Sequence, residues 1–147
     1  MMSLETTIAD EVVTLLNGNS FSQPFTAVRD WMPVFDPDLL SNLSVVVIPK
    51  RTNLENASRK AVRHDIEISI AVQQRLGLAT GDAGDKAEID LLQNLADEIR
   101  NFLIQRSLTS ASFSGIEHRV LVDPAYLYEL RTFTSLITLT YRAFVTS

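Results

Sequence analysis

The chain has 147 residues, of which 46% are hydrophobic and 21% charged, and this composition excludes intrinsic disorder, collagen-like repeats and low-complexity linkers. Its length suits one domain over residues 1–147 with a single core. Thirteen Lys and Arg against 18 Asp and Glu give a net charge of −5, which argues against a broad basic surface for duplex nucleic acid.

The first third of the chain predicts a helix and two strands. Apolar residues recur every three to four positions over residues 4–17, with Ser3 placed to cap the helix and Gly18 to end it. Residues 24–35 mix aromatic and branched side chains, which predicts a strand that Pro33 interrupts, hence an edge or a bulge. Residues 43–49 predict a second strand.

The middle of the chain predicts a loop, a long strand and a second helix. Residues 50–60 are polar and show neither the helical nor the strand period of apolar residues, which predicts a long loop. In a compact domain such a loop often has a function. Residues 61–74 alternate between apolar and polar, which is typical of a strand with one solvated face in an antiparallel sheet. After a flexible connection at 77–84, a helix is predicted over 86–106, with Asp85 and Glu88 spaced as a capping box.

The last third predicts two more strands. Residues 116–122 predict the first, and 126–130 a turn or short helix. Residues 132–145 alternate again and predict a closing strand whose exposed face is a ladder of threonines. The order α-β-β-β-α-β-β predicts an α+β fold, with a mostly antiparallel sheet of four to five strands and both helices on its apolar face. We expect the core to include Ile66, Ile68, Ile70, Leu92, Ile99, Ile137 and Leu139.

Two expectations concern the setting of the chain. No apolar run approaches the about 18–20 residues of a membrane span, and the first residues lack the basic and apolar segments of a secretory signal. We therefore expect no membrane contact and synthesis inside a cell.

No enzymatic motif is found in the sequence. It has no cysteine, which excludes disulfides, thiolate zinc sites and cysteine nucleophiles. Lys86 follows three glycines but is flanked by Asp85 and Ala87, unlike the lysine of a phosphate-binding loop. No serine has the spacing of a nucleophile elbow, and the acidic residues of 82–90 do not match a calcium loop. We expect no catalytic residue, metal or cofactor.

The two histidines have no metal-ligand spacing either. His64 lies on the apolar face of its strand and is expected as a hydrogen-bonded histidine of the core or its rim. His118 stands between Glu117 and Arg119 and is expected to be solvated. An enzyme whose site is assembled from distant residues remains an alternative, and a deep pocket that joins His64 to two carboxylates would favour it.

Charge is distributed unevenly along the chain. Residues 50–64 hold five basic residues and one acidic, whereas 82–98 hold six acidic residues and one basic. One interpretation is an ordinary solvated surface. The other is that the basic segment of one copy meets the acidic segment of its neighbour in a head-to-tail contact that can close a ring. The candidate interface residues are then Lys50, Arg51, Arg59, Lys60, Arg63, Asp82 and Asp85.

Taken together, these features resemble one family. An N-terminal helix, a basic segment after residues 45–49, the alternating strand 64–72, the helix 88–99 and a final strand around 138–142 are similar to the tail-terminator (tail-completion) family of long-tailed bacteriophages. Neck and other head–tail connector proteins share much of this pattern and are the alternative.

The resemblance implies a structural protein without enzymatic activity, present at the head-proximal end of the tail in the virion and made in the host bacterial cytoplasm. It implies a hexameric ring that caps the tail tube, ends its polymerisation and presents its other face to the neck or head-completion protein. DNA passes through the lumen without sequence-specific binding, and carboxylates facing it repel the phosphates. The resemblance places residues 50–60 at the surface that faces the tube or the neighbouring subunit.

Overall fold

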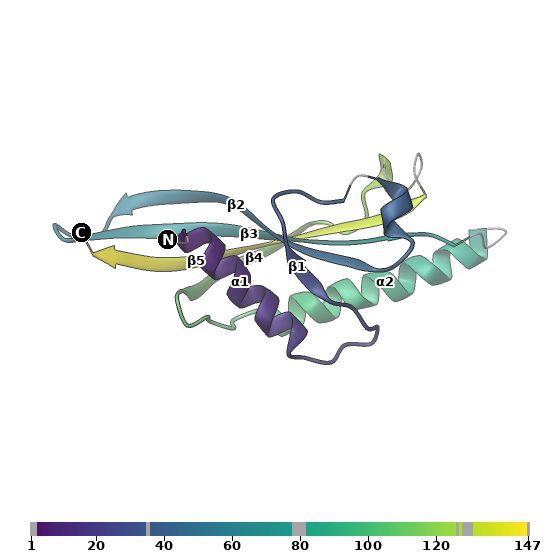
Figure 1. The fold of residues 1–147 in the computed structure, drawn as a ribbon, viewed down its shortest axis with the longest axis horizontal. Coiled ribbons are helices and arrows are strands. Elements are labelled where there is room, and N and C mark those ends of the chain that lie inside the picture. Colours follow the sequence, from purple (N-terminus) through teal and green to yellow (C-terminus); the bar gives the residue numbers. More distant parts are fainter. Residues whose placement is uncertain (1–2, 35, 78–81, 126, 128–130, 147) are drawn as a thin grey trace.

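The computed structural model describes residues 3–34, 36–77, 82–125, 127 and 131–146. Its elements follow the predicted order (Figure 1), and the chain is a single α+β unit. They are α1 (Leu4–Asn17), β1 (Ala27–Arg29), the 3-10 helix η1 (Pro37–Leu40), β2 (Ser44–Asn56), β3 (Ala61–Arg75), α2 (Asp82–Leu103), β4 (Ser112–Val120) and β5 (Thr132–Thr146).

The five strands form one sheet in the order β1-β2-β3-β5-β4. Strands β3 and β5 pair over their whole length, from Ala61 opposite Thr146 to Arg75 opposite Thr132. All pairs are antiparallel except β1 with β2. The strand predicted over 24–35 is reduced to the three residues of β1 at the sheet edge, and Pro33 lies beyond it, because the chain turns away after Asp30 donates its backbone N–H to Val47.

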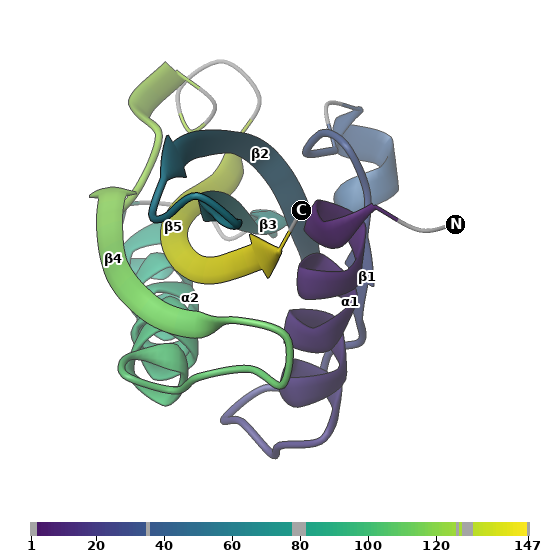
Figure 2. The same cartoon turned by 90° about the vertical axis from the view of Figure 1, so that its left-hand side faces the viewer.

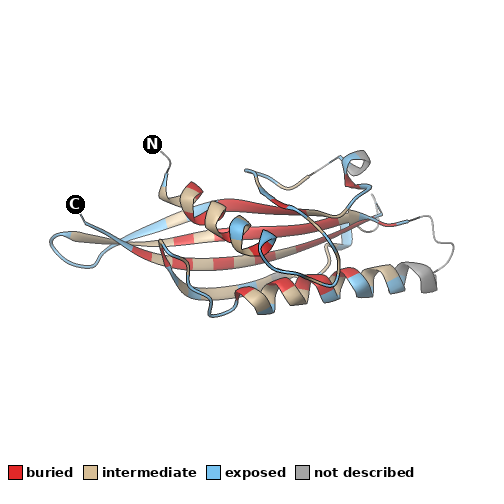
Figure 3. Cartoon of the chain, turned by 60° about the horizontal axis from the view of Figure 1, so that its bottom comes forward, coloured by how far each residue is buried: buried red, intermediate tan, exposed pale blue. Residues whose placement is uncertain are grey.

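Both helices pack on the same face of the sheet, as predicted. Helix α1 lies along β1 and β2, while α2 lies across β5 (Figures 1 and 2). The main core forms between them, and the buried residues run along the middle of the strands and the inner faces of the helices (Figure 3). All seven predicted core residues are confirmed as buried.

The ends of α1 follow the sequence signals. The Ser3 hydroxyl accepts the backbone N–H of Thr6 at 3.2 Å, and the N–H of Gly18 bonds the carbonyl of Thr14 at 3.0 Å. The start of α2 differs from its prediction: the helix begins at Asp82, so Asp85 lies within its first turns and not at the cap. The Glu88 carboxylate accepts the backbone N–H of Gly77 at 2.9 Å instead.

The second face of the sheet is only half solvated, which corrects the prediction of an open face. The buried Gln73 side chain donates to the Val34 carbonyl at 2.8 Å and accepts the Val34 N–H at 2.9 Å, so the segment after β1 covers this half. A second apolar cluster forms beneath it from Val46, Ile48 and Ala71. Thr132 and Thr134 of the expected threonine ladder are buried here, whereas Thr138 and Thr140 are half-buried.

The remaining predictions are confirmed in part. The strand predicted at 116–122 begins earlier, at Ser112, and ends at Val120. Most of the turn or short helix predicted at 126–130, and residues 78–81 of the predicted connection, lie outside the described residues. Over the described part of the chain, no helix combines the length and apolar character that crossing a membrane requires.

Candidate interaction surface

The segment predicted as a loop at residues 50–60 is instead a β-hairpin. Strand β2 continues to Asn56, a tight turn follows in which Ala57 and Ser58 bond the Ala61 carbonyl, and β3 returns antiparallel to it. The C-terminal end of β5 lies along the other side of β3. These three strand ends project from the rest of the molecule (Figures 1 and 3). We call residues 50–67 and 140–146 the arm, and the rest of the chain the body.

A bulge in β2 begins the arm. Pro49 stands opposite Ile68 and Arg51 opposite Glu67, so Lys50 is an extra residue without a register partner. Strand β1 pairs only with residues 45–47, which leaves β2 as an edge strand where its proline and bulge occur. Strand β2 therefore has no neighbouring strand on its outer side within the arm.

Opposite charges face each other across the strands of the arm. Arg51 pairs with Glu67, and Arg63 pairs with Glu55, in each case with the residue directly opposite in the register. Asp65 accepts from Arg142 on β5 at 2.8 Å. The Arg142 guanidinium holds the pKa of Asp65 below its usual value, since it hydrogen-bonds the charged form. These pairs align the three strands.

The structure thus separates the predicted interface residues into three kinds. Arg51 and Arg63 already have carboxylate partners within the arm. Lys50, Arg59 and Lys60 are exposed, two of them at the hairpin turn. The other two, Asp82 and Asp85, belong to the first turns of α2, and their side chains lie outside the described part of the structure. The head-to-tail contact remains a prediction.

Sequence reasoning missed the exposed apolar residues of the surface. Leu54, Phe144 and Val145 are exposed on the arm, and Trp31 and Met32 are exposed on the body. The sequence placed Trp31 inside a strand, which did not distinguish it from a core residue. Phe144 fell on the threonine face of the closing strand, which was predicted to be exposed, and its exposure agrees with that. The adjacent pair Trp31-Met32 in a stretch without regular period was the available signal.

His118 is enclosed, which corrects the expectation of a solvated side chain. Its side chain is 6% exposed, with Nδ1 at 3.2 Å from Arg100 and Nε2 at 2.7 Å from the Ser135 hydroxyl. Ser135 in turn donates to the Val120 carbonyl at 3.1 Å. Burial is the main cause of a lowered His118 pKa, and the Arg100 charge lowers it further. This chain of hydrogen bonds joins α2 to β4 and β5.

His64 has a different environment. It is half-buried on the core-side face, and its Nδ1 has no hydrogen-bond partner, contrary to the expectation of a bonded histidine. The nearby carboxylate of Glu5 accepts from the Thr52 hydroxyl at 2.7 Å, which is the main cause of a lowered Glu5 pKa. A single carboxylate whose hydrogen bonding is already used does not make the two-carboxylate pocket that would favour an enzyme.

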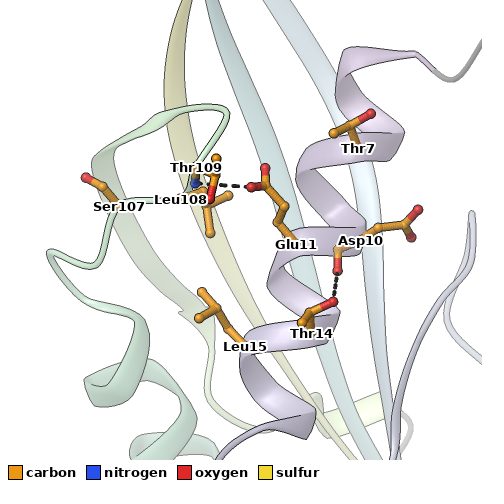
Figure 4. A pocket seen from close by; sticks show the side chains of 8 residues that line it. All are labelled: Thr7, Asp10, Glu11, Thr14, Leu15, Ser107, Leu108 and Thr109. Carbon is orange, nitrogen blue, oxygen red and sulfur yellow. Dashed lines mark hydrogen bonds between the residues drawn. The ribbon is translucent and has the colours of Figure 1, made fainter.

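The hollow between α1 and residues 107–109 has a volume of about 500 Å³ (Figure 4). Its acidic side chains are engaged structurally: Glu11 accepts the N–H groups of Thr109 and Ser110, and Asp10 pairs with Arg29 at 2.8 Å. The hydroxyl of Thr14 donates to the Asp10 backbone carbonyl at 3.0 Å. The lining therefore offers hydrogen bonds that fix the loop to the helix, and no nucleophile held against a base.

Neither histidine lines this hollow or three further hollows found along the described residues. Within the same part of the chain, no three acidic or histidine side chains come together as a metal site. In comparisons with known proteins, neither a family model nor a curated protein matches the chain. The exposed arm, with its charges and apolar side chains, is consequently the strongest candidate for a functional surface.

Proposed function

We propose that this chain is a structural protein of a phage or prophage tail that forms a ring, caps the tail tube and ends its polymerisation. The observation that carries the proposal is the separation of charge between arm and body. The arm holds six basic and three acidic residues, which leaves seven basic and 15 acidic residues in the rest of the chain. Surfaces of opposite sign at two places on one subunit favour head-to-tail association, and such contacts form a ring when the rotation between neighbouring subunits closes.

The body's negative charge also suits the passage of DNA. A ring whose inner surface is rich in carboxylates repels phosphate and lets the genome slide, whereas a basic lumen would hold it by counterion release. The proposal therefore includes no sequence-specific DNA binding. The partners are other copies of the chain, the tube protein, and the neck or head-completion protein on the opposite face. No enzymatic step is part of this function.

The test combines native particle mass with electron microscopy of the chain mixed with purified tail-tube subunits. We expect rings near six subunits and tubes that stop elongating with a density at one end. Tube subunits polymerised alone are the control and should give longer, open tubes. A chain that stays monomeric and leaves tube length unchanged at low and high salt would contradict the proposal. Rings that bind a neck protein but not the tube would instead indicate a neck or head–tail connector protein.

A further inference from the structure

Seven of the ten large apolar side chains that are exposed on the described residues fall into two groups. Three belong to the end of the arm: Leu54, Phe144 and Val145. Four belong to the segment around β1 and η1, and we call them the Trp31 group: Val28, Trp31, Met32 and Leu39. Exposed apolar side chains that gather on one part of the surface mark interaction sites, whereas single scattered ones do not.

The arm carries exposed apolar side chains on both faces near its end. Leu54 lies two residues from Thr52, which is opposite the buried Ile66, so Leu54 continues the core-side face. Val145 continues the same face from the buried Tyr141, four residues earlier. Phe144 points to the opposite face and is 62% exposed. Leu54 and Val145 therefore offer an apolar surface on one face of the arm, and Phe144 lies on the other face.

Trp31 is held in place although it is 60% exposed. Its backbone N–H donates to the Asp30 carboxylate at 2.7 Å, and the Asp30 N–H is anchored to Val47 of β2. The Arg29 guanidinium, itself paired with Asp10 of α1, lies 5.8 Å from the centre of the Trp31 ring. A fixed, solvent-facing tryptophan loses little entropy on binding, which is a property of residues that dominate interface energies.

The charges around the two groups are complementary. Arg59 and Lys60 are exposed at the hairpin turn of the arm, while Asp30 and Asp36 are exposed beside the Trp31 group. Two acidic side chains of α2 are engaged within the same subunit, as Asp30 is with the Trp31 N–H. Asp97 pairs with Arg100 at 3.2 Å, and Glu98 accepts the Ser22 N–H at 3.1 Å.

The two groups do not meet within one subunit. The hairpin projects from one end of the molecule, whereas η1 and the neighbouring segment lie toward the other (Figures 1 and 3). We propose that the arm of one copy docks on the Trp31 group of a second copy, with Leu54 and Val145, which share the core-side face of the arm, covering Trp31 and Met32. This rests on the proposed function only in that the contact would close a ring; head-to-tail association follows from the two separate surfaces.

Site-specific cross-linking tests this directly, because the native chain has no cysteine. Two single variants, Met32→Cys and Val145→Cys, are prepared as full chains, mixed in equal amounts and treated with a short bismaleimide. We expect covalent dimers in the mixture and not in either variant alone. The matched control mixes Val145→Cys with Leu91→Cys, since Leu91 is 60% exposed, close to the 57% of Met32, but lies on α2.

A second variant measures the energetic role of Trp31. Trp31→Ala placed in the Met32→Cys chain should lower the dimer yield at least tenfold, whereas Leu91→Ala in the same chain should not change it. Circular dichroism confirms that both variants fold. Cross-linking through Leu91→Cys in place of Met32→Cys, equal cross-linking of a single variant with itself, or no cross-linking with and without tube protein each overturns the proposal.

The outcomes separate this docking contact from the tail function. Capped tubes without the cross-link would contradict the docking contact and would still support the tail function. The specific cross-link in a protein that does not affect tubes would support the docking contact and contradict the tail function.

Discussion

The guanidinium of Arg100 donates a hydrogen bond to Nδ1 of His118 at 3.2 Å, and this sets the proton positions of the whole chain of contacts. Because arginine is only a donor, Nδ1 is the acceptor and Nε2 carries the hydrogen that points at the Ser135 hydroxyl, 2.7 Å away. Ser135 then donates to the Val120 carbonyl. The geometry fits a neutral imidazole, and a second proton on His118 would face the Arg100 charge.

The stability of the fold should therefore depend on pH through His118. Its pKa is lowered in the folded state, so the unfolded chain binds the proton more readily. The stabilisation is fully present above the unfolded pKa of about 6.5 and is lost as pH falls through the folded pKa. Urea unfolding between pH 8 and pH 5 should show a falling free energy of unfolding.

The variant His118→Gln isolates this contribution. It should cost about 1–3 kcal/mol at pH 8, because the buried partners lose a matched hydrogen bond. The difference between the native chain and the variant should then shrink toward pH 5. A difference that stays constant across this range would mean that His118 is not the titrating group.

The side chain of Gln73 makes a second test, since it holds the segment that carries Trp31. Gln73→Ala leaves both the N–H and the carbonyl of Val34 without their partner, at an expected cost of about 1–3 kcal/mol. Hydrogen exchange at the Val34 amide should accelerate more than exchange in β3. Gln23→Ala, whose side chain bonds Leu91 on α2 instead, is the control and should leave Val34 protected.

The core offers a third prediction with a clear contrast. Ile68 is 0% exposed between the sheet and the helices, so Ile68→Ala should lower the free energy of unfolding by about 2–5 kcal/mol. Leu91→Ala removes a similar apolar side chain that is 60% exposed, and it should cost less than about 0.5 kcal/mol. Similar costs for the two in chemical denaturation would contradict the assignment of the core face.

The sequence predicts the elements that bury one face, and the reasons are local. Strands β3 and β5 alternate because their residues point in turn to the core and away from it. Helix α1 carries its own cap at Ser3 and its own end at Gly18. These signals need no knowledge of distant contacts, and they were sufficient for the α+β fold.

The features that sequence reasoning missed depend on the absence of burial or on long-range contacts. Residues 51–56 of β2 show no period, because all of them except Thr52 are exposed and nothing selects an apolar side. His118 bonds Arg100, which lies 18 residues away on another element. The cover that Val34 provides over Gln73 spans 39 residues. No local pattern contains this information.

The hairpin predicts that charge reversal at Arg51 and at Arg59 affects the stability of the fold differently. Arg51 stands opposite Glu67, so Arg51→Glu places two carboxylates directly across the strands and should lower stability by about 0.2–1 kcal/mol. Arg59 lies exposed at the hairpin turn, and Arg59→Glu should leave the free energy of unfolding within about 0.5 kcal/mol.

Assembly should respond in the opposite order. If the arm docks on the acidic surroundings of the Trp31 group, Arg59→Glu weakens self-association more than Arg51→Glu, and added salt reduces the difference between Arg59→Glu and the native chain. Sedimentation velocity over a concentration series, together with urea unfolding, measures both effects on the same samples. Equal self-association of the Arg59→Glu variant and the native chain at low salt would remove the hairpin turn from the contact, because at that ionic strength a charge reversal in an interface is least screened.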